Sequence, residues 1–181
     1  MRRRQVKIVL LYEDQAHNSF LRQYATRKGY GNRAIRIAEG AGSGKTSVQR
    51  NYVPNVRAHR KYCTKNQSET LALLVMIDQD APRQPDPYAD FDKGLTDAGL
   101  GRRTAAEHIA IFAPRYSIET WAYHLLDVGR PVDETTNFAQ HRYGIGAPEC
   151  RRAGAEFSTY DPEECPLPSL VAGCGERRRI P

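Results

Sequence analysis

The feature that most constrains this chain is a set of short apolar segments that have no polar face. The segments "VKIVLLY" (residues 6–12) and "LALLVMI" (residues 71–77) are apolar on both of their alternating faces. This pattern is typical of strands in a parallel sheet that helices cover on both sides. Two shorter segments, "RAIRIAE" (residues 33–39) and "HIAIFA" (residues 108–113), are predicted as further strands. The strands therefore predict a buried, mainly parallel sheet.

Helical patterns alternate with these strands. Residues 13–29 group their apolar side chains on one side, and a stretch up to about Cys63, interrupted by Pro54, is predicted as helical or mixed. A weak helix is predicted for residues 88–100. Ser117 is a plausible N-cap for a helix with an apolar stripe at the i, i+3, i+4, i+7 and i+8 positions, formed by Ile118, Trp121, Ala122, Leu125 and Leu126. The predicted fold class is α/β, with a central sheet of about four strands flanked by helices.

The same pattern suggests how the chain is divided. We predict one sheet-containing domain over residues 1–127. Residues 128–181 contain proline, glycine and cysteine without a clear period. They are predicted to be a C-terminal extension that is either packed on the domain or irregular.

Charge is distributed unevenly along the chain. The net charge is +6, but residues 1–67 hold 15 lysines and arginines against three acidic residues, whereas residues 68–181 hold 12 against 18. A basic segment joined to a carboxylate-rich one suits a protein that binds a polyanion and also holds cations. The alternative is a solvated basic surface on an ordinary protein.

Location and cysteine chemistry follow from composition. The start of the chain imitates a signal peptide, but Glu13 and Asp14 cut its apolar stretch short, so we expect a cytoplasmic protein that does not enter a membrane. The four cysteines form no CxxC pair, and reduced thiols are the preferred interpretation. A zinc site built from the three C-terminal cysteines and His141 is the alternative.

A glycine-rich stretch, "GAGSGKTSV", resembles a phosphate-binding loop. Gly44, Lys45 and Thr46 have the required spacing, but Glu39 stands where the first glycine of that motif is needed. A carboxylate there would face the anion that the loop is meant to hold. We interpret the stretch as a flexible loop before a helix. A nucleotide hydrolase that uses these three residues, with Asp78 holding Mg²⁺, stays as the alternative.

Carboxylates follow three of the four predicted strands. Glu13 follows the first, Asp78 and Asp80 follow the third, and Glu119 lies in the first turn of the helix after the fourth. Parallel strands present their carboxyl ends at one edge of the sheet, where open α/β sheets bind ligands. Adjacent carboxylates repel each other unless a cation lies between them, and oxygen ligands suit Mg²⁺ or Mn²⁺. The sequence therefore predicts a metal site formed by these four acids, although each could simply cap a helix or begin a loop.

These motifs together resemble a known fold. A glutamate after the first strand ("VLLYED") and an Asp-x-Asp after a later apolar strand ("LLVMIDQD") are similar to the TOPRIM fold of topoisomerases, primases, OLD-family nucleases and small bacterial defence nucleases. The stretch "IAIFAPRYSIETWAYHLL" resembles the last strand and helix of the small stand-alone TOPRIM nucleases. The resemblance covers residues 6–127. It departs from the family in one place, because Asp14 stands where many members have glycine.

The resemblance implies a function for the acids. It implies cleavage of phosphodiester bonds in DNA or RNA, assisted by Mg²⁺ or Mn²⁺. Asp78 and Asp80 would bind the principal ion. Glu119 and Glu13 would complete the site or hold a second ion, and Glu13 is also the candidate for general acid–base work.

Basic residues and partners follow from the same interpretation. Lys45, Arg57, Arg60 and Lys61 would neutralise backbone phosphates. Arg115 would stabilise charge on the phosphate, with a surface salt bridge as its alternative role. By likeness to small TOPRIM proteins, we expect an antiphage effector that works with an AAA- or ABC-type ATPase and can form a homo-oligomer. The other alternative is a non-catalytic module that binds nucleic acid or a partner.

Overall fold

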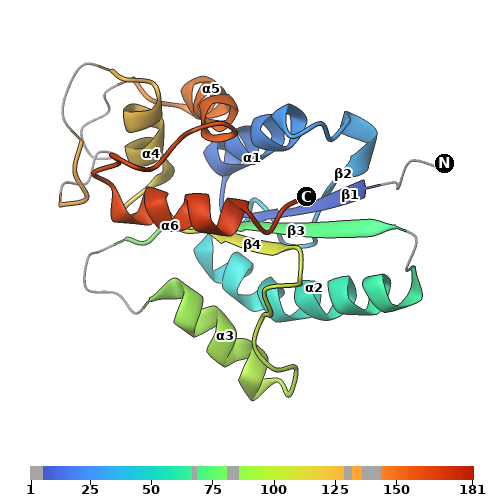
Figure 1. Ribbon diagram of the computed structural model, residues 1–181. Helices are drawn as coiled ribbons and strands as arrows, with labels where there is room; N and C mark the ends of the chain where they lie inside the picture. Colours follow the sequence, from blue (N-terminus) through green and yellow to red (C-terminus); the bar gives the residue numbers. More distant parts are fainter. Residues whose placement is uncertain (1–5, 67–68, 81–85, 129–131, 136–143) are drawn as a thin grey trace.

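The sheet is four-stranded and entirely parallel. In the computed structural model, which describes residues 6–66, 69–80, 86–128, 132–135 and 144–181, the strand order is β2-β1-β3-β4 (Figure 1). All neighbouring pairs are parallel. The strands are β1 (Val6–Tyr12), β2 (Ile35–Ile37), β3 (Thr70–Met76) and β4 (Ile109–Phe112). The predicted α/β fold class is confirmed.

Helices cover both faces of this sheet. In Figure 1, α1, α4 and α5 lie on one side, α2 and α3 lie on the other, and α6 runs alongside β4. The six helices of the described residues are α1 (Gln15–Arg27), α2 (Lys45–Lys65), α3 (Pro87–Asp97), α4 (Ile118–Leu125), α5 (Ala147–Phe157) and α6 (Pro168–Arg177). A short 3-10 turn (Asn32–Ala34) precedes β2.

Because side chains alternate along each strand, the core has two halves. The half under α1, α4, α5 and α6 receives Ile8, Leu10, Ala72, Leu74, Ala110 and Phe112 from the sheet. The half under α2 and α3 receives Leu11, Leu73, Val75, Ile109 and Ile111. Both faces of the strands are apolar because both are covered, which is why the sequence shows continuous apolar segments rather than alternation.

Helix α2 does not stop at Pro54. It runs unbroken for 21 residues with Pro54 inside it, so the predicted interruption is wrong. Pro54 is exposed, and the carbonyl group that loses its helical partner can therefore be hydrated. The buried side chains of Val48, Tyr52 and Val56 hold the helix on the sheet on both sides of the proline. Tertiary packing thus overrides the local penalty.

Two helices, α5 and α6, lie in the C-terminal region that carried no clear period. Helix α5 packs closely on α1, because a Cβ atom at Gly154 would lie only 2.2 Å from the carbonyl oxygen of Phe20. Ala153 and Phe157 on the same helix belong to the core half under α1. The C-terminal region is therefore packed against the sheet domain. The division at residues 127 and 128 itself stays a prediction.

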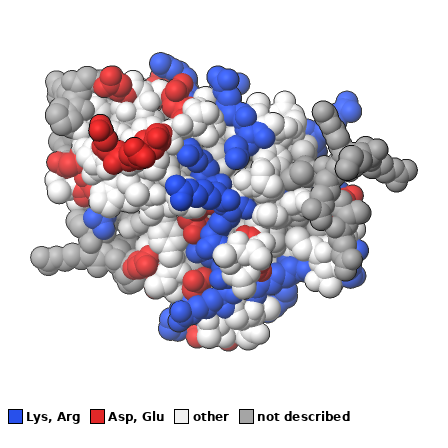
Figure 2. Space-filling view, viewed as in Figure 1, with Lys and Arg blue, Asp and Glu red and all other residues white. Residues whose placement is uncertain are grey.

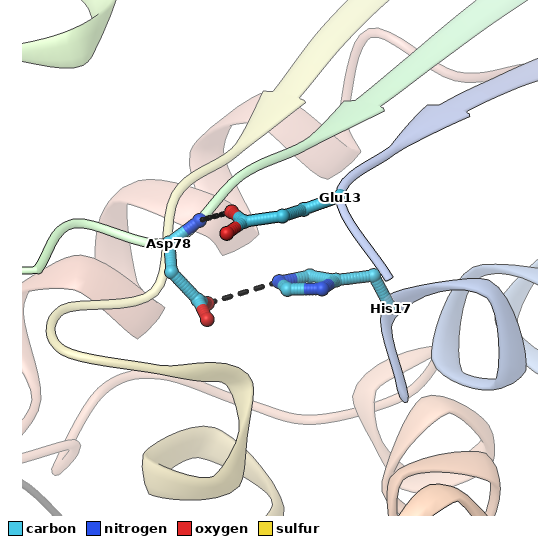
Figure 3. Close-up of side chains that lie close together, drawn as sticks. All are labelled: Glu13, His17 and Asp78. Atoms are coloured by element: carbon cyan, nitrogen blue, oxygen red, sulfur yellow. Dashed lines mark hydrogen bonds and ion pairs between the residues drawn. The ribbon is translucent and has the colours of Figure 1, made fainter. Parts of the chain in front are cut away.

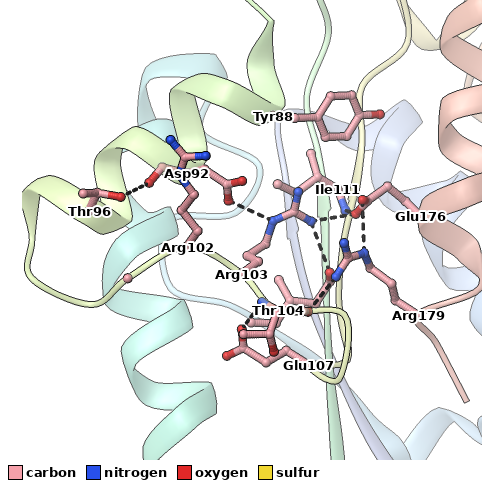
Figure 4. Close-up of polar contacts among 12 residues, drawn as sticks. Tyr88, Asp92, Thr96, Arg102, Arg103, Thr104, Glu107, Ile111, Glu176 and Arg179 are labelled. Carbon is pink, nitrogen blue, oxygen red and sulfur yellow. Dashed lines mark hydrogen bonds and ion pairs between the residues drawn. The ribbon is translucent and has the colours of Figure 1, made fainter.

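A partly buried ionic cluster closes the β4 edge of the sheet (Figure 4). The Glu176 carboxylate accepts a hydrogen bond from the Ile111 amide at 2.9 Å. This amide would otherwise be available to pair with a further strand. The same carboxylate accepts from Arg103 at 2.7 Å and from Arg179 at 3.2 Å. Arg103, whose side chain is 4% exposed, also lies 3.3 Å from Asp92 on α3. The cluster thus joins α3, β4 and the C-terminal helix, and it protects an edge that could otherwise pair with another chain.

Charges of both signs share the surface. On the face in Figure 2, lysine and arginine side chains form a band through the middle and along the bottom, whereas acidic side chains gather at the upper left. Ion pairs of Lys7 with Glu69, Lys45 with Asp80 and Arg60 with Glu107 join the basic first part of the sequence to the acidic second part. Sequence position alone does not locate a basic surface.

The contact between α1 and α5 makes a stability prediction. We expect Gly154→Ala to lower the free energy of unfolding by about 1–3 kcal/mol, because the new methyl group would force the two helices apart. Gly175→Ala is the matched control, since a Cβ atom at this helical position meets no atom within 4 Å. It should be neutral or stabilising, by up to about 1 kcal/mol. Urea denaturation measures both, and equal midpoints for Gly154→Ala and the wild type would contradict this packing.

Candidate metal centre at the carboxyl edge of the sheet

Two acids from neighbouring strands meet at the carboxyl edge of the sheet. Glu13 directly follows β1, and Asp78 lies two residues beyond β3. The main-chain amide of Asp78 donates a hydrogen bond to the Glu13 carboxylate at 3.1 Å. His17, from the start of α1, completes the group, and Figure 3 shows the three side chains together. One potential ligand atom from each residue lies within 4.8 Å of the others. The structure therefore brings together two of the four predicted acids and adds a histidine.

Asp14 explains why His17 reaches this edge. Its carboxylate caps α1 by accepting hydrogen bonds from the amides of Ala16 at 2.9 Å and His17 at 3.1 Å. A carboxylate in this position satisfies amides that a helix N-terminus leaves without partners. The helix thus begins immediately after β1, and its first turn carries His17 back over the sheet. The acid that departs from the TOPRIM pattern is therefore the residue that starts α1.

His17 is fully buried between two carboxylates. Its Nδ1 lies 2.8 Å from Asp14 Oδ1, and its Nε2 lies 2.9 Å from Asp78 Oδ1. Both bonds are satisfied only when each ring nitrogen carries a hydrogen, as in the imidazolium form. Burial by itself lowers the pKa of His17, but the charges and hydrogen bonds of Asp78 and Asp14 outweigh it and raise the pKa to about 10. The ring is therefore an internal cation.

The two acids beside His17 respond in opposite directions. Burial raises the pKa of Asp14, but the hydrogen bond and charge of His17 outweigh it and lower the pKa to about 2. Burial also raises the pKa of Asp78, and the negative charges of Glu13 and Glu119 add to this effect. The net pKa of Asp78 is about 6 even with His17 alongside. A further cation at this edge would therefore stabilise the charged form of Asp78.

The other two predicted acids lie apart from this group. Asp80 has a side chain that is 59% exposed, and its Oδ2 lies 2.6 Å from Lys45 Nζ at the start of α2. Glu119 stands in the first turn of α4. Its negative charge contributes to the raised pKa of Asp78, but Glu119 does not belong to the tight group. Asp78 and Asp80 thus have different partners, although an extended chain would place them on one face.

The glycine-rich loop packs against the end of β1. The amide of Gly42 donates to the Tyr12 carbonyl at 2.8 Å, and the amide of Gly44 donates to the Glu13 carbonyl at 2.9 Å. A phosphate loop needs such amides to converge on phosphate oxygens. Because two of them are paired with β1, the loop does not offer that cradle. Its role in this structure is to hold the end of β1 and to place Lys45 beside Asp80.

The predicted basic residues have different surroundings. Arg57 and Lys61 are exposed on α2, and neither forms an ion pair with another residue of the described parts of the chain. Arg60 instead pairs with Glu107 at 2.5 Å and also donates to backbone carbonyls. It therefore anchors the loop before β4. Arg115 is one-third exposed, and its Nε lies 3.9 Å from Glu134 Oε2. This ion pair corresponds to the alternative role of Arg115 in a salt bridge.

The cysteines form no disulfide within the described ranges, and all four are free. Among the described residues, the only group of three metal-ligating side chains is that of Glu13, His17 and Asp78. The alternative zinc site requires His141, which lies outside the described residues. No helix in the described part of the chain is both long and apolar enough to cross a membrane.

Sequence reasoning missed His17, although a signal for it was present. His17, Phe20, Leu21 and Tyr24 follow the i, i+3, i+4, i+7 spacing and are all buried. A titratable side chain on the apolar stripe, one turn after the first strand, is a reason to look for a charged partner at the edge of the sheet.

No family model and no curated protein matches the sequence. Among solved structures, the fold is similar to the C-terminal region of the Burkholderia pseudomallei OLD protein, with 12% identity over 95% of this chain and 96% of that chain and a TM-score of 0.46.

The charge on His17 makes a pH prediction. The folded state keeps a proton that the unfolded chain releases near the ordinary histidine pKa of about 6.5, so the stabilisation is complete below that pH and is lost as the pH rises through about 10. Between about pH 7 and pH 8 the free energy of unfolding should fall with rising pH less steeply in His17→Gln than in the wild type. The two slopes should differ by up to about 1.4 kcal/mol per pH unit. Urea denaturation at several pH values measures the slopes.

Nitrogen NMR of the imidazole rings gives a direct test. At about pH 8 His17 should show the imidazolium signature. His124 should be neutral, because burial lowers its pKa. A neutral His17 ring under these conditions would contradict the proposed charge state.

Proposed function

We propose that this protein is a divalent-metal-dependent nuclease that cleaves phosphodiester bonds of DNA or RNA. The observation that carries the proposal is the convergence of the Glu13 and Asp78 carboxylates at one edge of the sheet. Glu119 acts on Asp78 from α4, and Lys45 lies on the adjacent side. This arrangement offers oxygen ligands for a cation and a positive side chain for a phosphate.

The donor set fits Mg²⁺ or Mn²⁺. Glu13 and Asp78 would hold the ion through carboxylate oxygens, which are the ligands that these ions prefer. His17 Nε2 is engaged by Asp78 Oδ1, so His17 would orient this carboxylate and leave its second oxygen for the metal. Such hydrogen bonds to ligating carboxylates hold their orientation. When bound, the ion would polarise the scissile phosphate and lower the pKa of a bound water.

The remaining groups of the chain have separate tasks in this proposal. Glu13 Oε2 accepts from the Asp78 amide and would also hold the ion through its second lone pair, whereas Oε1 would accept the proton of an attacking water. Lys45 would neutralise phosphate charge beside the acids. Asp80 holds Lys45 in place at 2.6 Å and does not belong to the tight group of ligand atoms. We therefore assign Asp80 a smaller contribution than Asp78.

Helix α2 would carry the nucleic-acid strand to the site. Arg50, Arg57 and Lys61 are exposed along it, and Lys45 stands at its first residue. At about 1.5 Å per residue, the basic side chains from Lys45 to Lys61 extend over roughly 24 Å. Each would neutralise one phosphate, and the set leads directly to the acids at the edge of the sheet.

The wider role is proposed from the TOPRIM resemblance alone. In this role the protein would be an antiphage effector in the cytoplasm, would work with an AAA- or ABC-type ATPase and would associate with copies of itself. The nucleotide-hydrolase alternative is disfavoured, because the amides of Gly42 and Gly44 are paired with β1. A binding module without catalysis would bind nucleic acid but would not cleave it. Removal of the carboxylates would leave its affinity for nucleic acid unchanged.

The roles of the two aspartates can be separated by substitution. We expect Asp78→Asn to lower the cleavage rate with Mg²⁺ or Mn²⁺ by at least about 100-fold, because it removes a charge from a metal ligand while keeping the shape. Asp80→Asn should have a smaller effect, since Asp80 is exposed and paired with Lys45. Asp97→Asn is the matched control, because Asp97 forms an exposed ion pair with Lys93 on α3.

Calorimetric titration with Mn²⁺ provides a second measurement that does not depend on cleavage. Wild type and Asp97→Asn should bind the ion alike, and Asp78→Asn should bind it at least about tenfold more weakly. Full cleavage and full Mn²⁺ affinity in Asp78→Asn would falsify the assignment of this site.

Binding along α2 makes a salt-dependence prediction. For Arg57→Gln combined with Lys61→Gln, the slope of log K against log[salt] should fall in magnitude by about 1.4 for single-stranded nucleic acid, because two phosphate contacts are lost. Arg178→Gln, at the exposed end of α6, is the control and should leave the slope unchanged. Fluorescence anisotropy in EDTA measures binding without cleavage. An unchanged slope in the α2 variant would place the nucleic acid elsewhere.

A further inference from the structure

We propose that a pocket beside the metal centre binds one unpaired nucleobase, so that the substrate is a single strand or an unstacked nucleotide. This inference rests on the proposed nuclease function and specifies its substrate class. The pocket lies between α2, α3 and the end of β3, and its volume is about 230 Å³. Lys45 and Asp78 both line it, which makes it continuous with the site.

The walls of the pocket are largely apolar and aromatic. Tyr52 and Val53 line it from α2, and Phe91 lines it from α3. The rings of Tyr52 and Phe91 are 4.3 Å apart between centroids and inclined by 49°. Ile77 contributes from the end of β3. The two rings pack on each other, and only 1% of Tyr52 and 6% of Phe91 is exposed. A base would therefore contact the apolar wall that they form with Val53, and such contact does not require a particular base.

Polar groups at the pocket suit the edge of a base. Gln79 lines the pocket, and its side-chain amide nitrogen donates to the Ala113 carbonyl at 2.9 Å. This bond fixes the orientation of the amide. It leaves the side-chain oxygen of Gln79 without a hydrogen-bond partner in the described part of the structure. Gln49, which is exposed and also lines the pocket, supplies further donors and acceptors. Such groups can pair with amino and carbonyl groups of a base.

The volume of the pocket limits the ligand. Pockets for drug-sized ligands measure about 300–1,000 Å³, and this pocket is smaller. It suits one heterocyclic base rather than a complete nucleotide. The sugar and phosphate would remain at the edge of the sheet, where Lys45 and the carboxylates lie. The base would therefore enter on the α2 side while its phosphate lies over Asp78.

The position of the pocket also decides between paired and unpaired substrates. A base can reach a pocket between two helices only if it leaves the stack, as it does in enzymes that bind a flipped or single-stranded base. Unstacking costs least when the base is already unpaired. We therefore infer a preference for single-stranded nucleic acid over duplex.

Gly94 on α3 allows the pocket to be filled without disturbing the core. It lines the pocket, and a Cβ atom built there would lie 3.6 Å from Val53 Cγ2, an ordinary contact distance. Gly94→Ala therefore changes the helix but leaves most of the space open, whereas Gly94→Leu places a large side chain in it. The alanine variant is the matched control for the leucine variant. Val53→Phe fills the pocket from α2 and provides an independent second variant.

The experiment compares strands with and without bases. Fluorescein-labelled homopolymers of thymidine and of deoxyadenosine are compared with a fully abasic strand of the same length and charge, by anisotropy in EDTA. Wild type and Gly94→Ala should bind the abasic strand on the order of tenfold more weakly than the strands that carry bases. Gly94→Leu and Val53→Phe should bind all three strands with the affinity that the wild type shows for the abasic strand.

Two results would overturn the inference. One is equal binding of abasic and base-containing strands by the wild type. The other is a wild-type preference for bases in both filled variants, with circular dichroism melting used to confirm that they are folded. The binding assay contains EDTA and no metal, so its outcomes are separate from the nuclease proposal. A cleavage assay with Mg²⁺ or Mn²⁺ on the same variants tests that proposal. Base-dependent binding without cleavage would support the pocket and reject the nuclease. Cleavage that Gly94→Leu and Val53→Phe leave unchanged would support the nuclease and reject the pocket.

Discussion

The parallel pairing of β1 with β3 is the constraint on which the site depends. The two strands pair over seven positions, and Tyr12 lies opposite Met76 at the last of them. This register brings the residues that follow the two strands to one edge, so that the Glu13 carboxylate accepts a hydrogen bond from the Asp78 amide. A shift by one residue would exchange the two apolar faces of β3 between the core halves and move Asp78 away from Glu13. The register of this pairing, and not the apolar pattern alone, therefore fixes the position of the two acids.

A buried cation balances the charge that this pairing creates. His17 lies between Asp14 and Asp78 with both ring nitrogens engaged. Burying isolated charges is costly, and the cost is recovered only when the partners are close and the hydrogen bonds are complete. The arrangement holds Asp78 in one orientation. Its pKa is nevertheless raised by burial and by the neighbouring acids. A divalent ion at this edge would therefore stabilise the charged form of Asp78.

The two faces of the sheet contribute different chemistry to the same edge. The face under α1 supplies the charged group of His17, Asp14 and Asp78. The face under α2 and α3 supplies Lys45 and the aromatic pocket. Asp78 contacts the first and lines the second, so it stands where the two meet. In the complex that we propose, the phosphate would lie at this strand end and its base would lie on the α2 side.

The sequence by itself determined the strands and the edge at which two of the candidate site acids lie. Continuous apolar segments specify buried parallel strands, and the acids that directly follow such strands must lie at their carboxyl edge. Only the tertiary structure decided the rest. His17 became part of the site because the Asp14 cap turns α1 over the edge, and Asp80 separated from Asp78 because Lys45 lies on the other side. Helices α5 and α6, and the passage of α2 through Pro54, depend on contacts with elements distant in sequence. Local propensity and spacing do not contain such contacts, because their free energy exists only after the sheet has formed.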